Sequence, residues 1–149
     1  MSCKSTNVKQ AGSSSPIQSA IQPADYTSTA LGDNTATGLS CDSGVQVGDV
    51  VYVNGSTIQK ASALTYQSSL AVGIVVNKSG ATTCDIATTG PISVLSGLDT
   101  SKKYFISETT AGALQTTPPT LSGSYVIQIG KPLGTTIFTI QIVRIVKRI

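Results

Sequence analysis

The sequence predicts an all-β protein, a small antiparallel β-sandwich or barrel preceded by an extended N-terminal arm. From Val45 onward, turn-forming residues recur roughly every 8–12 residues with short β-branched runs between them, as in sandwiches and barrels. No later segment has the apolar spacing of a helix without Gly, Pro or crowded β-branched residues, and residues 61–70 are the one ambiguous stretch. Charged residues make up only 11% of the 149 residues, so hydroxyl and amide groups must form much of the surface.

Residues 1–30 differ from the rest of the chain and predict a separate arm. They contain the cluster Ser13-Ser14-Ser15-Pro16, few large apolar side chains, and no acid before Asp25. This composition favours a mildly basic segment that becomes ordered on a partner surface, the alternative being a terminus without a function. The arm residues expected to contact a partner are Lys4, Lys9, Ile17 and Ile21. Residues 31–149 are expected to form the all-β domain.

The clearest strand pair is a hairpin around Asn54-Gly55. Residues 50–53 and 56–59 flank this dipeptide, which favours a type I′ turn because both residues tolerate positive φ. Residues 70–76 form a nearly continuous apolar run and predict a buried strand. Gly73 within it would allow close approach of a neighbouring backbone.

The remaining predicted strands are separated by turns and one long loop. Turns are expected at residues 77–80, at Gly90-Pro91 and at residues 97–102. Residues 109–124 contain repeated Gly and Pro, so we expect a long exposed loop there. The strands are expected at residues 81–87, 92–94, 104–106, 125–129 and 136–146.

The last predicted strand changes its pattern near Ile142. Up to that residue, one face is apolar and the other carries Thr139 and Gln141, but Val143 and Ile145 then place apolar side chains on this second face. Either a β-bulge near Ile142 redirects the chain, or the strand leaves its sheet and enters an interface between subunits. We expect the interface, with Val143 and Ile145 buried between copies. The basic residues expected at its rim are Arg144, Lys147 and Arg148.

Residues that carry enzyme chemistry are sparse. The chain has no histidine, which removes His-based acid–base catalysis, His-containing triads and His-ligated metal sites. The acidic residues are scattered singly, whereas carboxylate catalysis needs two converging groups. Residues 123–131 have the wrong glycine spacing for a phosphate-binding loop, and Pro132 follows the lysine. We therefore expect no enzyme, and no catalytic, cofactor-binding or metal site.

Cysteine count, hydropathy and charge limit the partners further. Cys3, Cys41 and Cys84 are odd in number and widely spaced, so free thiols are expected, with a Cys41–Cys84 bridge as the alternative. No apolar run approaches the ~20 residues that span a bilayer, and the first residues lack the apolar core of a signal peptide. We expect synthesis in the cytoplasm and no membrane partner.

Nucleic acid is not expected as the main partner. A net charge of +3 and an aromatic content of 5% are too low for the dense basic patch with stacking aromatics that nucleic-acid binding requires.

Two groups of motifs resemble small β-domains of tailed-bacteriophage virion proteins. The first group is GVQVGDVVYV at residues 44–53, AVGIV at 71–75 and TGPI at 89–92. The second group is GLD at 97–99, KYFIS at 103–107, GALQTTPP at 112–119 and YVIQIG at 125–130. The second group is similar to a module that recurs in head and tail fibres, with a Tyr-containing strand, a Thr-Thr-Pro-Pro loop and a strand ending in Gly. The resemblance covers roughly residues 44–142, and none of its motifs is catalytic.

The resemblance implies a structural protein on the capsid surface of a virion, a decoration protein or head-fibre subunit. Its arm would dock on the major capsid protein. Its β-domain would associate with copies of itself as a homotrimer, since low surface charge leaves apolar strand faces uncovered. The alternative is a tail-fibre or spike tip that binds a host-surface glycan or protein through Tyr104, Tyr125 and the loop at residues 109–124. A third reading, a small hydrolase or lyase, lacks a nucleophile–base pair.

Overall fold

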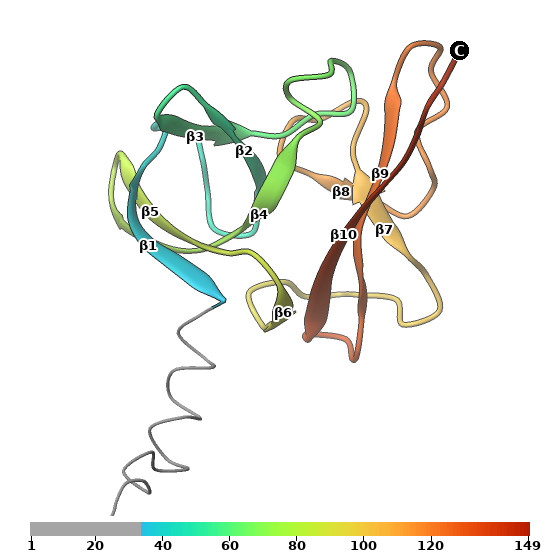
Figure 1. Cartoon of the computed structure of the whole chain (residues 1–149). Helices are drawn as coiled ribbons and strands as arrows, with labels where there is room; N and C mark the ends of the chain where they lie inside the picture. The colour runs from blue at the N-terminus through green and yellow to red at the C-terminus, as the bar shows by residue number, and fades with distance from the viewer. Residues whose placement is uncertain (1–33) are drawn as a thin grey trace, which may run out of the picture. The chain divides into compact units, whose positions relative to one another are not determined.

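The computed structural model describes residues 34–149, which form ten β-strands and no helix (Figure 1). The first five are β1 (Thr35–Ser40), β2 (Val50–Asn54), β3 (Thr57–Lys60), β4 (Ala71–Gly80) and β5 (Thr83–Ala87). The next five are β6 (Gly90–Ile92), β7 (Tyr104–Ile106), β8 (Leu114–Gln115), β9 (Tyr125–Pro132) and β10 (Phe138–Lys147). The predicted arm contacts Lys4, Lys9, Ile17 and Ile21 lie outside the described residues, as does Cys3.

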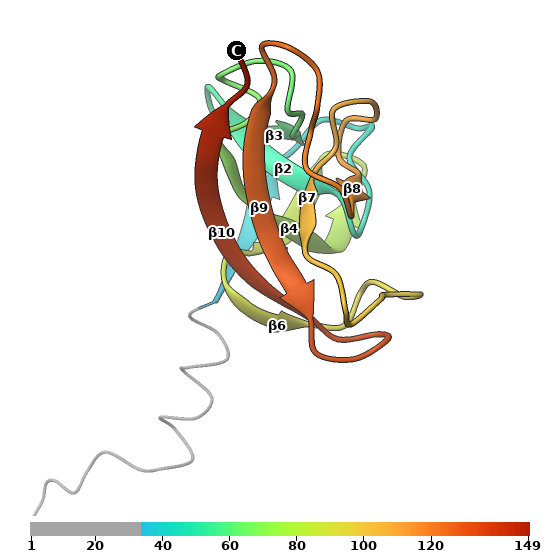
Figure 2. The same cartoon turned by 90° about the vertical axis from the view of Figure 1, so that its right-hand side faces the viewer.

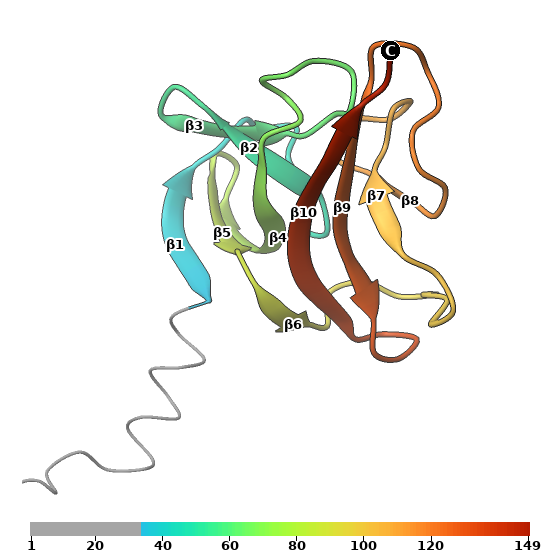
Figure 3. The same ribbon diagram turned by 45° about the vertical axis from the view of Figure 1, so that its right-hand side comes forward.

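The strands form two sheets that follow one another along the chain. The first has the order β1-β5-β4-β2-β3 and the second β6-β10-β9-β7-β8. Every ladder between named strands is antiparallel. Figure 2 shows the long β9–β10 pair of the second sheet, and Figure 3 shows β10 beside β4 of the first. The all-β prediction is confirmed, and the architecture is two antiparallel sheets rather than a closed barrel.

The predicted β2–β3 hairpin is confirmed, but its turn lies one residue further along. Asn54 pairs with Thr57, so the two loop residues are Gly55 and Ser56. Gly55 has a φ of +65°, the positive φ that the first loop residue of both primed hairpin turns, I′ and II′, adopts. Asn54 continues the strand instead, and its amide donates to Gln59 Oε1 at 3.1 Å.

Strand β4 confirms the strand predicted at residues 70–76 and continues to Gly80. The turn predicted at residues 77–80 is therefore wrong, because the chain turns between Gly80 and Thr83. Lys78, inside the strand, secures this end of the hairpin. Its Nζ donates to the backbone oxygens of Ser43, Val45 and Ala81.

Two strand glycines lie where neighbouring backbones come close together. A Cβ at Gly73 would collide with the carbonyl oxygen of Ala87, and one at Gly130 with that of Thr139. The close approach predicted at Gly73 is therefore confirmed. Gly130 performs the same function in the second sheet, where β9 and β10 pair.

The second sheet begins earlier than predicted, and its long loop is more ordered. β6 starts at Gly90 rather than residue 92, and Pro91 is tolerated because β6 is an edge strand. The loop predicted at residues 109–124 contains β8, and Pro119 within it is fully buried. Glu108 holds this loop by accepting the backbone N–H groups of Thr120 and Leu121, both at 2.8 Å. The loop is therefore not uniformly exposed.

Side chains from both sheets share the main hydrophobic core. The first sheet contributes Val50, Tyr52, Ile74 and Ala87, and the second contributes Ile92, Tyr104, Ile106, Ile127, Ile129, Phe138 and Ile140. Tyr104 and Phe138 meet edge to face, with ring centroids 5.7 Å apart, an arrangement that adds to the burial of both rings. A second cluster lies within the first sheet and contains Cys41, Val45, Val51, Ile58, Val75, Cys84 and Ile86.

Cys41 and Cys84 are free and buried within this second cluster. Burial, together with a hydrogen bond to the Cys41 thiol, raises the pKa of the Cys84 thiol to about 12. The prediction of free thiols is confirmed for these two residues. Both pack as small apolar side chains, and the reactive thiolate form of Cys84 is strongly disfavoured.

The change of pattern predicted near Ile142 corresponds to a β-bulge. Ile140 pairs with Gly130 and Val143 with Gln128, so β10 carries one extra residue between these two pairs. A second bulge lies between Arg144 and Val146. Strand β10 nevertheless stays paired with β9 as far as Lys147, so it does not leave its sheet. The expectation that the strand leaves its sheet is therefore wrong, and the bulge, which was the alternative, is what the structure has.

Candidate functional site: the two faces of strand β10

The last part of β10 exposes an apolar row made of Val143, Ile145 and Val146. These side chains are 44%, 51% and 52% exposed. Val143 and Val146 lie opposite Gln128 and Val126, which are two residues apart on β9 and therefore point to the same side of the sheet. Ile145 is the extra residue of the second bulge. Branched aliphatic residues grouped on one exposed strand are typical of a surface that a partner covers.

The opposite face of the same strand carries a tyrosine–cation cluster, made of Tyr66, Tyr125, Arg144 and Lys147. Arg144 and Lys147 pair with Ile127 and Tyr125 of β9, on the side opposite to Val143 and Val146. The Arg144 guanidinium carbon lies 5.4 Å from the centre of the Tyr66 ring, and Lys147 Nζ lies 5.7 Å from that of Tyr125. The two rings meet edge to face, with centroids 6.0 Å apart.

The loop at residues 61–70, which presents Tyr66, is held by a dense set of hydrogen bonds. The hydroxyls of Thr65 and Ser68 lie 2.7 Å apart, and the Ser68 hydroxyl also donates to the Ser62 carbonyl. Ala63 fastens the loop to the second sheet, because its carbonyl accepts the Tyr125 N–H at 2.8 Å. The three ribbon views agree that this green loop lies beside the C-terminal end of β10 (Figures 1, 2 and 3).

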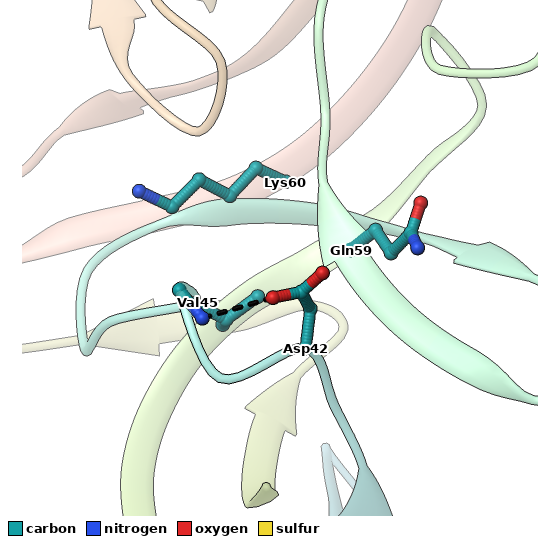
Figure 4. A pocket seen from close by; sticks show the side chains of 5 residues that line it. Asp42, Val45, Gln59 and Lys60 are labelled. Carbon is teal, nitrogen blue, oxygen red and sulfur yellow. Dashed lines mark hydrogen bonds between the residues drawn. The ribbon is translucent and has the colours of Figure 1, made fainter. Parts of the chain in front are cut away.

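A pocket of about 270 Å³ lies in the first sheet, lined by Asp42, Gly44, Val45, Gln59 and Lys60 (Figure 4). Each of its three polar side chains has at least one partner within the chain. Asp42 Oδ1 accepts the Gly44 N–H at 2.9 Å, and Lys60 Nζ lies 3.5 Å from Asp49 Oδ2. Gln59 Oε1 accepts hydrogen bonds from Tyr52 and Asn54. We therefore place the functional site on β10 and not in this pocket.

The structure places the sequence-predicted contact residues in different surroundings. Val143 and Ile145 are exposed on β10, as a partner-binding role requires. Tyr104, a candidate for glycan binding, is only 8% exposed, and its hydroxyl accepts the Asp99 N–H at 3.0 Å. It is a core residue. Tyr125 is half-buried and belongs to the tyrosine–cation cluster.

Sequence reasoning missed Tyr66, which lies in the one stretch that it left ambiguous. Tyr66 is 61% exposed, and Leu64 in the same loop is also exposed. A sequence signal does exist, because an aromatic residue here stands among polar residues and lies outside any strand pattern. Arg144 and Lys147 were expected at the rim of a subunit interface, but they belong to the opposite face of β10 from Val143 and Val146.

Glu108 and Asp99 are two of the exposed carboxyl groups whose pKa is lowered because backbone and side-chain donors stabilise the charged form. The N–H groups of Leu121 and Thr120 lower the pKa of Glu108. The Ser101 hydroxyl and N–H lower the pKa of Asp99 to about 2. Both groups stabilise loops and do not converge with another acid. Within residues 34–149, no group of three or more Cys, Asp or Glu side chains is arranged to hold a metal ion.

Comparisons with protein-family models, curated proteins and solved structures gave no match to this chain. In the described part of the chain, no helix is long and apolar enough to cross a membrane.

Proposed function

We propose that this chain is a structural protein of a tailed-phage virion, a capsid decoration protein or head-fibre subunit. Residues 1–30 attach it to the major capsid protein, and the β-domain assembles with its copies into a homotrimer through β10. The motifs at residues 44–142 support the virion assignment, because they resemble fibre and decoration modules. The apolar row on β10 carries the assembly part of the proposal.

The apolar row supports assembly for an energetic reason. Three branched aliphatic side chains about half exposed on one strand leave apolar area in contact with water, and covering such area stabilises an association by roughly 25 cal/mol per Å² before the costs of ordering. The strand that bears them is paired with β9 along its length. It can therefore contribute to an interface without rearrangement of its own fold.

The assembly is tested by replacing Val143 and Val146 with serine in the full chain. Point substitutions are preferable to truncation after Ile142, since residues 143–147 pair with β9 and their loss would damage the sheet. We expect multi-angle light scattering to give a trimer for the parent chain and monomers for the double variant. The control is Val53→Ser, because Val53 is similarly exposed on β2, away from β10. A monomeric parent chain at micromolar concentration would contradict the proposal.

Attachment to the virion is tested by deleting residues 1–30. The expected result is loss of the protein from purified particles in mass spectrometry, with the melting temperature within a few degrees of the parent. Absence of the intact protein from the particles would refute the virion assignment itself. Cryo-electron microscopy of the particles separates the two locations, because density on the capsid supports the proposal and density at the tail tip supports the receptor-binding alternative.

A further inference from the structure

The loop at residues 61–70 is built more firmly than a simple connection requires. Its hydroxyl side chains bond to one another and to the loop backbone. These bonds involve Ser62, Thr65, Ser68 and Ser69. What this rigid loop presents to solvent is Leu64 and Tyr66, two large side chains that contribute little to the core. Rigid presentation of exposed apolar groups is characteristic of recognition loops. The loop is already ordered in the folded chain, so ligand binding does not include the entropy cost of ordering it.

Arg144 lies over the ring of Tyr66 and Lys147 over that of Tyr125, and neither cation forms an ion pair with an acid of the described residues. The ion pairs among residues 34–149 are Lys60–Asp49 and Lys102–Asp99, and neither involves Arg144 or Lys147. From residue 109 to the end of the chain there is no Asp or Glu at all. A guanidinium that lies over an aromatic ring keeps its own N–H groups free at its edge. Two of these N–H groups can form a bidentate pair with a carboxylate or phosphate.

We propose that the tyrosine–cation cluster binds an acidic saccharide. The apolar face of a sugar ring lies against Tyr66 and Leu64, and the carboxylate or phosphate of the sugar is held by Arg144 and Lys147. This inference goes beyond the virion assignment and does not depend on it. It also leaves the apolar row free for assembly, because Val143 and Val146 point to the other side of β10.

The geometry favours a saccharide over a nucleic acid. Successive bases of a single strand stack parallel to one another, whereas the Tyr66 and Tyr125 rings are inclined by 67°. The cluster also holds only two cations, Arg144 and Lys147, which are too few to follow a phosphate backbone. A single sugar unit needs one apolar surface and one anion-binding group beside it, and the cluster provides both.

The test measures binding of the full chain to four immobilised polymers by biolayer interferometry. The probes are a polyuronate, a phosphorylated mannan, neutral dextran and oligo(dT). We expect the chain to bind the polyuronate, the phosphomannan or both, with a Kd below about 1 mM, and to bind dextran weakly or not at all. The first two probes distinguish a carboxylated from a phosphorylated ligand.

Variants assign the binding to the cluster. Arg144→Gln and Tyr66→Ala should each weaken binding about tenfold or more, because each removes one of the two required contacts. The matched control is Lys131→Gln, which removes a positive charge from an exposed position of β9 and should change the Kd less than twofold. Melting curves of each variant verify that it is folded.

Three results would overturn the inference. They are equal binding to acidic and neutral polymers or to neither, stronger binding to oligo(dT) than to both acidic saccharides, and an equal loss of affinity in Lys131→Gln and Arg144→Gln. None of these results bears on the particle composition or the oligomeric state, so failure of the saccharide site is distinguishable from failure of the virion assignment.

Discussion

Replacing Gly73 with alanine should strongly destabilise the first sheet. Gly73 is the third residue of β4 and lies opposite Val51 of β2. A Cβ added there would collide with the carbonyl oxygen of Ala87 and lie 3.0 Å from its carbonyl carbon and 3.3 Å from the Cα of Thr88. All three atoms belong to the backbone, so no side-chain rotation can relieve the contact.

The size of the effect follows from what has to move. Overpacking a core with an extra methyl group typically costs about 1–3 kcal/mol when neighbouring side chains can adjust. Here the chain must shift beside two fully buried residues, Ile74 and Val75, so we expect a loss at the upper end, about 3 kcal/mol. At about 4 °C per kcal/mol for a domain of this size, the melting temperature should fall by about 12 °C.

The matched control is Gly134→Ala. Gly134 has no positive φ and nothing within 4 Å of an added Cβ, so alanine there should be neutral or stabilise by about 0.4–1 kcal/mol through the unfolded chain. Thermal unfolding followed by circular dichroism measures both variants. If Gly73→Ala melts within 2 °C of the parent chain, the close approach of β4 to the chain after β5 is wrong.

Three other predictions concern groups that stabilise local structure. Because the pKa of Glu108 is lower in the folded chain, its carboxylate stabilises the fold above its ordinary pKa of 4.5, and this stabilisation is lost as the pH falls through the folded pKa. Urea unfolding should therefore show Glu108→Gln to be less stable than the parent at pH 7 but not at the lowest pH, and a difference independent of pH would contradict the assignment. Lys78→Met should cost about 1–3 kcal/mol, because three carbonyl groups lose their shared donor, and an unchanged urea midpoint would refute this role. In a Cys3→Ser background, Cys41 and Cys84 should not react with a disulfide reagent at pH 8 until the chain is unfolded, since burial raises the thiol pKa of Cys84 to about 12. Rapid labelling of the native chain would show that the second cluster opens readily.

The sequence alone was sufficient for the fold class and for most strands, because those depend on local chemistry. Turn residues and β-branched runs predicted β4, β7 and β9 close to their observed positions. A few residues with β-branched or alternating apolar side chains are enough to indicate a strand. This local pattern is the same whichever strand becomes the neighbour in the sheet. For the final strand, the loss of alternation near Ile142 located the irregularity but left a bulge and a departing strand as alternatives, and the structure has the bulge, which was not the one expected.

Tertiary structure decided the register and the surfaces, because both depend on pairings between distant residues. The β2–β3 turn shifted by one residue because Asn54 pairs with Thr57. The loop predicted to be exposed at residues 109–124 was drawn onto the second sheet because Glu108 accepts its N–H groups. Tyr66 meets Arg144 across 78 positions of chain, and no local pattern in either segment contains that contact. The two faces of β10, one apolar and one aromatic and cationic, exist only once β9 pairs with β10 and the loop at residues 61–70 packs beside them.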